Sequence, residues 1–354
     1  MRGSLCAWGP MKATLYYAAG EPEVLTYTDV ADPEPGPADV IIKVAATALN
    51  RLDIVQRAGW FQLPGFTYPH IPGMDIAGSV VAVGDEVTEW QNGDRVIVDP
   101  SLVGVSDQSK LADSDNLHGE HGIIGATRDG GYAELCLVPA SHCLSIPDHV
   151  SFESAATFPT CWVTASHALY PIGNLQAGET IMIHAAGSGV SVAAIQLAKD
   201  SGAVVLATAG TDAKCERAVE LGAHHVFNNR TGDLAAWVRS VTGGLGVDLV
   251  LDHVGAALFG PSLTALAVKG RLVTCGNTSG DEATIRSLGF LYRSQISILG
   301  SGAHEPGEVA AVWDRFCGGG LSGVVDTEFD LSEAGAAHMR MHDNNFFGKI
   351  LLRP

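Results

Sequence analysis

The sequence lacks the cysteine pattern of a disulfide-bonded or zinc-stapled protein. Its seven cysteines are odd in number and never form a C-x-x-C pair; they stand at Cys6, Cys136, Cys143, Cys161, Cys215, Cys275 and Cys317. Paired spacing is what secreted disulfide frameworks and structural zinc sites require. The pattern therefore predicts a chain kept in a reducing compartment, which we take to be the cytoplasm.

Long apolar runs and an excess of basic residues are also missing. No run of about 18 apolar residues occurs, so no membrane span is expected. The first ten residues lack the apolar stretch of a signal peptide and are interpreted as an extension before Met11. The 21 Lys and Arg residues against 39 Asp and Glu give a formal net charge of −18. Such a field disfavours nucleic acids and anionic membranes as partners.

The 354 residues suffice for two domains, and the two halves differ in their patterns of expected strands and helices. Residues 11–158 have the pattern of short strands between turn signals, at 40–48, 77–84 and 94–99, which predicts an antiparallel, barrel-like domain. Within this half, the segment 99–130 is polar and loop-like.

From residue 178, strands alternate with helices, which predicts a parallel, doubly wound sheet. The expected strands are 180–185, 203–209, 225–228, 247–252 and 270–276, and the expected helices are 190–201, 211–221, 234–241 and 258–268. A last strand at 348–354 is expected to return to the first half.

A glycine-containing turn joins the first expected strand and helix of the second half. Its sequence, AAGSGVS at 185–191, has a slipped spacing relative to G-x-G-x-x-G, with Ser191 at the third glycine. Gly187 would permit the tight turn, Gly189 the close approach of a phosphate, and Ser191 the packing of helix on strand. Backbone N–H groups at a helix start favour a pyrophosphate. We therefore predict a dinucleotide along Gly187, Ser188, Gly189 and Val190; the alternative is a plain strand–helix turn.

The end of the next strand indicates which dinucleotide binds. An acid there would take the ribose hydroxyls of NAD, but Ala209 and Gly210 carry no carboxylate. Asp212 is expected in the first turn of the following helix instead. Thr211 and Lys214 are therefore predicted to contact the adenosine phosphate, and NADPH is favoured over NADH. Lys214 has a second interpretation, as a solvated helix charge.

Several short motifs in a fixed order carry a family resemblance over nearly all of residues 11–354. They are ALNRLD at 48–53, PGMDIAG at 72–78, NGDRV at 92–96, AATFPTCWVTASHAL at 155–169, DHVG at 252–255 and FGKILL at 347–352, beside the glycine turn. Together they resemble the medium-chain dehydrogenase/reductase family. The resemblance implies an α/β fold with a GroES-like β-barrel domain at 11–155 and 303–354. A Rossmann domain with a doubly wound parallel sheet would occupy 156–302.

The positions that hold zinc in the family's alcohol dehydrogenases correspond to Asn50, Met74 and Thr160 here. None is a good zinc ligand, and a catalytic zinc needs about three protein ligands. Cys161 is adjacent, but it is better interpreted as a buried small hydrophobe. The 99–130 segment has no cysteine; its His118-Gly-Glu-His121 sequence is interpreted as solvated surface rather than a metal cluster. The resemblance is thus to zinc-free members, and no metal is expected.

Zinc-free quinone and enone reductases of this family supply roles for matching residues. By that resemblance, Asn50 lies beside the nicotinamide and the substrate carbonyl, Asp53 fixes the loop, and Thr164 hydrogen-bonds near the nicotinamide. Trp60 and Phe61 would contact the substrate. The cofactor path would be lined by Asn229, Asn277, Ser279 and Lys349.

Two departures from that pattern matter. Trp60 and Phe61 stand where some enoyl reductases carry a proton-donating tyrosine, so reduction of fatty enoyl thioesters is disfavoured. Asn229 replaces a tyrosine near the adenosine phosphate, and the next residue, Arg230, has two interpretations, as a phosphate contact or a solvated charge. No dedicated acid is found, because His70 and His167 are better interpreted as structural or exposed; water is expected to supply the proton.

The sequence therefore predicts a zinc-independent, NADPH-dependent oxidoreductase that transfers hydride to a quinone or an α,β-unsaturated carbonyl compound. Two alternatives stand: an alcohol/carbonyl dehydrogenase of the same superfamily, and a non-catalytic NADPH-binding sensor or accessory protein. By resemblance the chain forms a homodimer or homotetramer through the segment 296–300.

Overall fold

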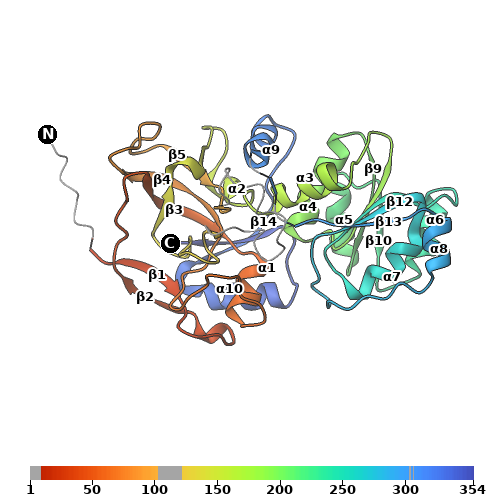
Figure 1. Ribbon diagram of the computed structural model, residues 1–354, viewed down its shortest axis with the longest axis horizontal. Coiled ribbons are helices and arrows are strands. Elements are labelled where there is room, and N and C mark those ends of the chain that lie inside the picture. Colours follow the sequence, from red (N-terminus) through yellow and green to blue (C-terminus); the bar gives the residue numbers. More distant parts are fainter. Residues whose placement is uncertain (1–8, 103–121, 303, 306) are drawn as a thin grey trace. The chain divides into compact units, whose positions relative to one another are not determined.

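The computed structural model describes residues 9–102, 122–302, 304–305 and 307–354, and the chain divides into two compact units (Figure 1). Unit 1 comprises Met1–Thr160 and Ser322–Pro354, and unit 2 comprises Cys161–Leu321. The second boundary follows Leu321, whereas the sequence placed it after residue 302. The intervening helix α9 (Glu308–Cys317) packs in unit 2 on α3 (Cys161–His167), where the rings of Trp162 and Phe316 meet edge to face at 4.9 Å between centroids.

The sheet of unit 1 is built around β3 (Asp39–Ala48). This strand pairs antiparallel with β4 (Asp75–Val83), β6 (Leu135–Pro139) and β15 (Lys349–Arg353). The sheet order is β14-β15-β3-β4-β5-β7, and its remaining strands are β5 (Arg95–Val98), β7 (Cys143–Ser145) and β14 (Val325–Asp330). A separate pair is formed by β1 (Met11–Leu15) and β2 (Thr26–Val30). The expected return of the last strand to the first half is confirmed.

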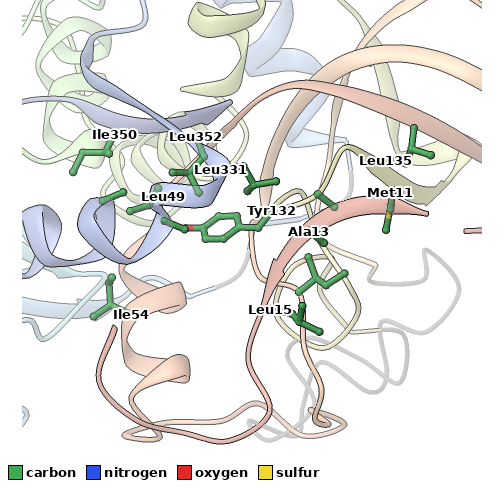
Figure 2. Packing of buried hydrophobic residues seen from close by; sticks show 14 of the residues in the cluster. Met11, Ala13, Leu15, Leu49, Ile54, Tyr132, Leu135, Leu331, Ile350 and Leu352 are labelled. Atoms are coloured by element: carbon green, nitrogen blue, oxygen red, sulfur yellow. The ribbon is translucent and has the colours of Figure 1, made fainter. Parts of the chain in front are cut away.

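An apolar cluster fills the space beside this sheet (Figure 2). Tyr132 is fully buried in it, among side chains of β1, β15 and the helices α1 (Arg51–Arg57) and α10 (Ala334–His342). The short helix α2 (Phe152–Ala156) packs on β3 and β4. The cluster matters for function because α1, which begins at the predicted site, lies against it through Ile54.

Unit 2 contains the predicted parallel sheet, with the order β10-β9-β8-β11-β12-β13. The strands are β8 (Thr180–Ile183), β9 (Val204–Ala209), β10 (His225–Asn228), β11 (Val247–Asp252), β12 (Leu266–Thr274) and β13 (Ser297–Gly300). The helices are α4 (Gly189–Asp200), α5 (Asp212–Leu221), α6 (Leu234–Val241), α7 (Ala256–Ala265) and α8 (Leu288–Arg293). Helix α4 packs with α3 and α5, and α6 packs with α7, as two faces of a doubly wound sheet require (Figure 1).

Among the predicted helices of unit 2, one differs from the structure by more than one residue at its ends. The sequence placed it at 258–268, but α7 spans Ala256–Ala265 and β12 begins at Leu266 rather than at 270. Leu266 pairs with Val247 of β11, so ladder hydrogen bonds take the backbone that the helix would have used. In the part of the chain that the structure describes, no helix is long and apolar enough to cross a membrane.

Candidate functional site

Asn50 stands in unit 1 between the end of β3 and the start of α1. Its backbone is extended (φ −123°, ψ 157°), and its N–H donates to Asp53 Oδ2 at 2.7 Å. This bond is half of a capping box, in which an acid three residues on accepts from the first residue's N–H. Both side chains are buried. Asp53 therefore holds the turn that presents Asn50.

A buried ion pair lies against Asn50. Lys349, at the start of β15, donates from Nζ to Asn50 Oδ1 at 2.7 Å and to Asp75 Oδ2 at 2.8 Å. The other oxygen of Asp75, Oδ1, accepts from Thr160 N at 2.8 Å and from Thr160 Oγ1 at 2.5 Å. Strands β3, β4 and β15 thus bring together three polar groups that the sequence separates widely. A buried ion pair persists where such hydrogen bonds satisfy both charges.

This arrangement leaves no set of metal ligands at the three positions matched to zinc. Asn50 and Thr160 are engaged by the Lys349–Asp75 pair, while Met74 is buried in an apolar cluster with Leu63 and others. Across residues 9–102 and 122–354, apart from 303 and 306, no group of three His, Cys, Asp or Glu side chains is placed to hold a metal. The residues therefore do not fit zinc at this site. His118 and His121 lie outside the described residues.

The remaining polar groups of unit 1 near Asn50 are buried deeply. Burial raises the pKa of Asp53 to about 7. Tyr132 Oη lies 3.5 Å from Asp53 Oδ2 and 3.1 Å from His338 Nε2, and burial lowers the pKa of His338 to about 3. His338 is accordingly neutral near pH 7 and acts as a packing and hydrogen-bonding group.

The other sequence-derived residues of unit 1 fall into two kinds. Trp60 and Phe61 follow α1 and are largely exposed, at 66% and 53%, as surfaces open to a ligand would be. His70 is 3% exposed, its Nε2 lies 3.1 Å from Gly125 O, and burial lowers its pKa. His70 is therefore structural, as its sequence context indicated.

The glycine turn of unit 2 connects β8 to α4 at the carboxyl edge of the sheet. Ser188 caps the helix by accepting from Ser191 N at 3.1 Å, and the first helical bond runs from Val192 N to Ser188 O. The N–H groups of Gly189 and Val190 precede that bond and have no partner within the helix. A phosphate group fits such a helix start.

Two details of this turn differ from the roles assigned from the sequence. The left-handed residue is Ala185 (φ 49°), so the tight turn is made there and not at Gly187. Ser191 is fully buried and donates from Oγ to His184 O at 2.6 Å, so it bonds the helix to the strand and does more than pack. A serine hydroxyl can reach that carbonyl, whereas the glycine of a regular fingerprint has no side chain to do so.

The end of β9 presents the residues predicted near an adenosine phosphate. Thr211 caps α5 by accepting from Lys214 N at 3.3 Å, and Asp212 begins the helix as expected. Asp212 Oδ1 accepts from Asn228 Nδ2 at 2.8 Å. The backbone N–H of Asn229 donates to Ala209 O at 2.9 Å.

Arg230 lies across the same strand end. A Cβ atom added to Gly210 would lie 3.4 Å from Arg230 Nε, so the guanidinium covers the glycine backbone in ordinary contact. The partly exposed Gly210 and the Arg230 guanidinium therefore lie together where β9 ends, near Asp212 at the start of α5.

The last three predicted residues of unit 2 have separate surroundings. Thr164 lies in α3 and is half-buried. Ser279 donates to Val254 O at 2.6 Å and accepts from Ala257 N at 3.0 Å, so it stabilises the start of α7. Asn277 Nδ2 donates to Asp281 at 2.7 Å. His167 lies 3.0 Å from Glu308 and is paired rather than placed as an acid.

Sequence reasoning gave no role to two residues that contact the predicted sites. Asp75 stood within a quoted motif, and its charge inside an apolar strand was the available signal. Lys349, which was predicted to line the cofactor path, donates to Asp75 and Asn50. His253 stood in the DHVG motif without a role, although it contacts the glycine turn.

Comparisons with known proteins agree with this architecture. Residues 36–148 match the alcohol dehydrogenase GroES-like domain, and residues 189–317 match the zinc-binding dehydrogenase domain. The chain is 31% identical to a quinone oxidoreductase of Pseudomonas aeruginosa, covering 97% of this chain and 99% of the relative. It is 29% identical to a 2-haloacrylate reductase of a Burkholderia species, covering 97% and 98%. A solved structure of an NAD-dependent alcohol dehydrogenase is 37% identical, with a TM-score of 0.90 over 97% of this chain and 100% of that one.

The predicted resemblance and fold class are therefore confirmed. Relatives that match along their full length are oxidoreductases, which identifies this chain as an NAD(P)H-dependent oxidoreductase. Sequence, sheet topology and relatives agree that the chain belongs to the medium-chain dehydrogenase/reductase family, as a quinone oxidoreductase-like member.

Proposed function

We propose that this protein reduces a quinone or the activated C=C bond of an α,β-unsaturated carbonyl compound with NADPH, without zinc. The observation that carries the proposal is the Lys349–Asp75 pair with Asn50 and Thr160, which fills the place of a metal-ligand set with a satisfied polar network. An alcohol is activated as a hydride donor by a metal or a strong base. An enone or quinone already has a low-lying orbital that accepts hydride, so it needs mainly a hydrogen-bond donor at its carbonyl oxygen.

Asn50 is the donor that this geometry favours. Because Lys349 donates to Asn50 Oδ1, the amide is held in one orientation, with Nδ2 on the opposite side, 3.5 Å from Ala48 O. The ammonium also polarises the amide and strengthens Nδ2 as a hydrogen-bond donor to a substrate oxygen. A bound nicotinamide dinucleotide supplies the hydride. Water supplies the proton that completes the reduction.

The choice of NADPH is supported by the end of β9. Ala209 and Gly210 present no carboxylate, and the carboxylate of Asp212 is bonded to Asn228. Arg230 covers Gly210, and Lys214 lies in the first turn of α5. We propose that Arg230, with Thr211 and Lys214, receives the 2′-phosphate. A guanidinium binds phosphate oxygens in a planar, bidentate manner.

The relatives support both this function and one alternative. The quinone oxidoreductase and 2-haloacrylate reductase relatives bear names that state reduction of a quinone and of an acrylate, whose C=C bond is conjugated with a carboxyl group. The solved relative at 37% identity is described as an NAD-dependent alcohol dehydrogenase, which favours carbonyl/alcohol interconversion as the second candidate.

A substrate panel separates the two candidates. NADPH and NADH are titrated against the purified protein, and the better one is then tested with enones, quinones, aldehydes and, in the oxidised form, alcohols. We expect enone or quinone reduction that is unchanged by a chelator, and substoichiometric zinc by elemental analysis. Binding of NADPH without oxidation by any quinone or enone would overturn the proposed reaction. Stoichiometric zinc lost together with activity would favour the alcohol dehydrogenase.

Other expectations stand as parts of the same proposal. Trp60 and Phe61 are proposed to contact the substrate, Thr164 the nicotinamide, and Asn229, Asn277, Ser279 and Lys349 the cofactor. The protein is proposed to act in the cytoplasm as a homodimer or homotetramer. The domain limits at 11–155, 156–302 and 303–354 stay proposals, beside the division at Leu321 described above.

A further inference from the structure

His253 lies at the centre of the carboxyl edge of the parallel sheet in unit 2. It follows β11, and β11 neighbours β8 in the order β10-β9-β8-β11-β12-β13. The chain leaves β8 towards β9 and leaves β11 towards β12, so the two connections diverge between these strands. Ligands of doubly wound sheets bind outside such a switch point.

The imidazole of His253 contacts both serines of the glycine turn. Its Nε2 lies 2.9 Å from Ser188 Oγ and 2.8 Å from Ser191 Oγ. The two hydroxyls are themselves 3.0 Å apart. The loop after β11 is therefore hydrogen-bonded to the loop after β8 across the switch point.

The pattern of donors fixes the tautomer of His253. Ser191 donates its single hydroxyl hydrogen to His184 O at 2.6 Å, so towards His253 it is an acceptor. Nε2 must then carry a hydrogen, which is assigned from the network. Ser188 donates to Ser191 Oγ and accepts from Ser191 N.

We propose that His253 is a positioning residue for the dinucleotide: it fixes both serine hydroxyls of the turn and leaves the backbone N–H groups of Gly189 and Val190 to bind the pyrophosphate. The inference rests on the proposed dinucleotide site and adds a residue that the glycine pattern does not contain. Ser191 is then a hydrogen-bonding partner for His253. This role explains why a serine stands where the regular fingerprint has a glycine.

The described groups beside His253 include several segments of the same sheet edge. His184 follows β8, the two serines begin α4, and Gly276 and Thr278 lie in the loop after β12, where Thr278 Oγ1 donates to His253 O at 3.2 Å. Burial and the charge of His253 lower the pKa of His184 to about 3. His253 is thus in contact with the loops after β8 and after β12.

Two substitutions test the positioning role. His253→Leu removes the Nε2–H donor, and we expect the Kd for NADPH to rise about tenfold, the loss typical of one buried hydrogen bond. His253→Gln keeps a donor near the position of Nε2, and its Kd at pH 8.5 is expected within about twofold of the wild type. His225→Leu, at the amino end of β10, is the matched histidine control. Thermal unfolding shows that each variant is folded.

The difference between these two variants is a readout that a merely structural histidine would not move, because both lack the imidazole and only His253→Gln keeps a donor for the serine hydroxyls. Equal Kd values for NADPH in the wild type, His253→Gln and His253→Leu would overturn the role of His253 alone. A wild type that does not bind NADPH would overturn the proposed function and this role together.

Discussion

Lys349 and Asp75 are charged side chains enclosed by strands. Their side chains are 5% and 0% exposed, and Lys349 Nζ lies 2.8 Å from Asp75 Oδ2, so each charge has an opposite charge as its partner. Removing one partner of such a pair leaves a buried charge uncompensated. The pair therefore joins the stability of unit 1 to the orientation of Asn50.

We predict that Lys349→Met lowers the free energy of unfolding by about 3–5 kcal/mol, because Asp75 keeps its charge without its partner. The same substitution frees the amide of Asn50 to rotate, so kcat/KM for the enone or quinone is expected to fall by about tenfold or more. Urea unfolding and steady-state kinetics measure the two effects.

The double variant Lys349→Met with Asp75→Asn separates these effects. It removes both charges while Thr160 keeps its acceptor, so most of the lost stability should return. Activity should stay low, because the ammonium that orients Asn50 is still absent. Recovery of activity together with stability would show that Lys349 acts only as a structural ion.

Asp53 makes the free energy of unfolding depend on pH with a sign opposite to that given by most carboxylates in folded proteins. Its pKa rises from 3.8 to about 7 on folding because the side chain is buried. Between about pH 4 and 7 the folded state keeps a proton that the unfolded chain has released, so this group lowers stability as pH rises. Asp53→Asn, which keeps an acceptor for the N–H of Asn50, should make the slope of unfolding free energy against pH more positive by about 1.4 kcal/mol per pH unit.

Denaturant unfolding at several pH values from 4 to 7 checks this prediction. His184 and His338 act in the opposite direction in both proteins, since burial lowers the pKa of each from 6.5 to about 3. Below pH 6.5 the unfolded chain binds protons that these folded histidines do not, so stability is lost as pH falls. Superimposable slopes for wild type and Asp53→Asn would contradict the raised pKa of Asp53.

At the scale of elements, much of unit 2 follows from local sequence. Helix α6 and strand β11 have the bounds that the sequence predicted, because Asp233 caps the helix and accepts from Ala236 N, and the strand is a short apolar run between turn residues. Helix α7 was extended too far because Leu266 and Val268 continue an apolar pattern. Its true end is set by pairing with β11, which a local pattern does not contain.

The candidate site shows the same limit. Asn50 and Asp53 were predicted together because they match a short N-x-x-D pattern of the family, and the structure shows that they share one helix start. Lys349 and Asp75 are 274 positions apart, so no periodicity relates them. The contact of His253 with Ser191 depends on the order of strands β8 and β11, which emerges only when the sheet is assembled.

The proposed selectivity of the β9 end for NADPH can be tested by substituting one residue, Arg230. Arg230→Ala should raise the Kd for NADPH by about 10- to 100-fold, the range for a lost charge-assisted hydrogen bond, and the Kd for NADH by less than about threefold. The ratio of the two constants, from fluorescence titration, is the measurement. Arg239→Ala on α6, whose guanidinium contacts Thr264 O, is the matched control. Equal losses for both dinucleotides would assign Arg230 to the structure of the strand end.

At the scale of the whole molecule, the comparisons and the two units agree on one architecture. The relatives match over 97% of this chain, across both units, so the fold and the general chemistry are shared. The residues proposed to contact the substrate, Trp60 and Phe61, are exposed at 66% and 53% in unit 1. Fold-level similarity therefore supports the reaction class more strongly than the substrate.

The interface of the proposed dimer is expected at one edge of the sheet in unit 2. Strand β13 is the last of the sheet order, and the helix before it exposes Leu288 and Tyr292, each at 68%. Among the described residues this strand edge has no further partner strand, and such an edge beside exposed apolar side chains favours pairing with a second copy. The double variant Leu288→Glu with Tyr292→Glu should shift the protein to a monomer, because four like charges would meet in a symmetric interface. Light scattering after size-exclusion chromatography measures the mass, and Leu245→Glu, at a residue 78% exposed, is the control. An unchanged oligomer in the double variant would place the interface elsewhere.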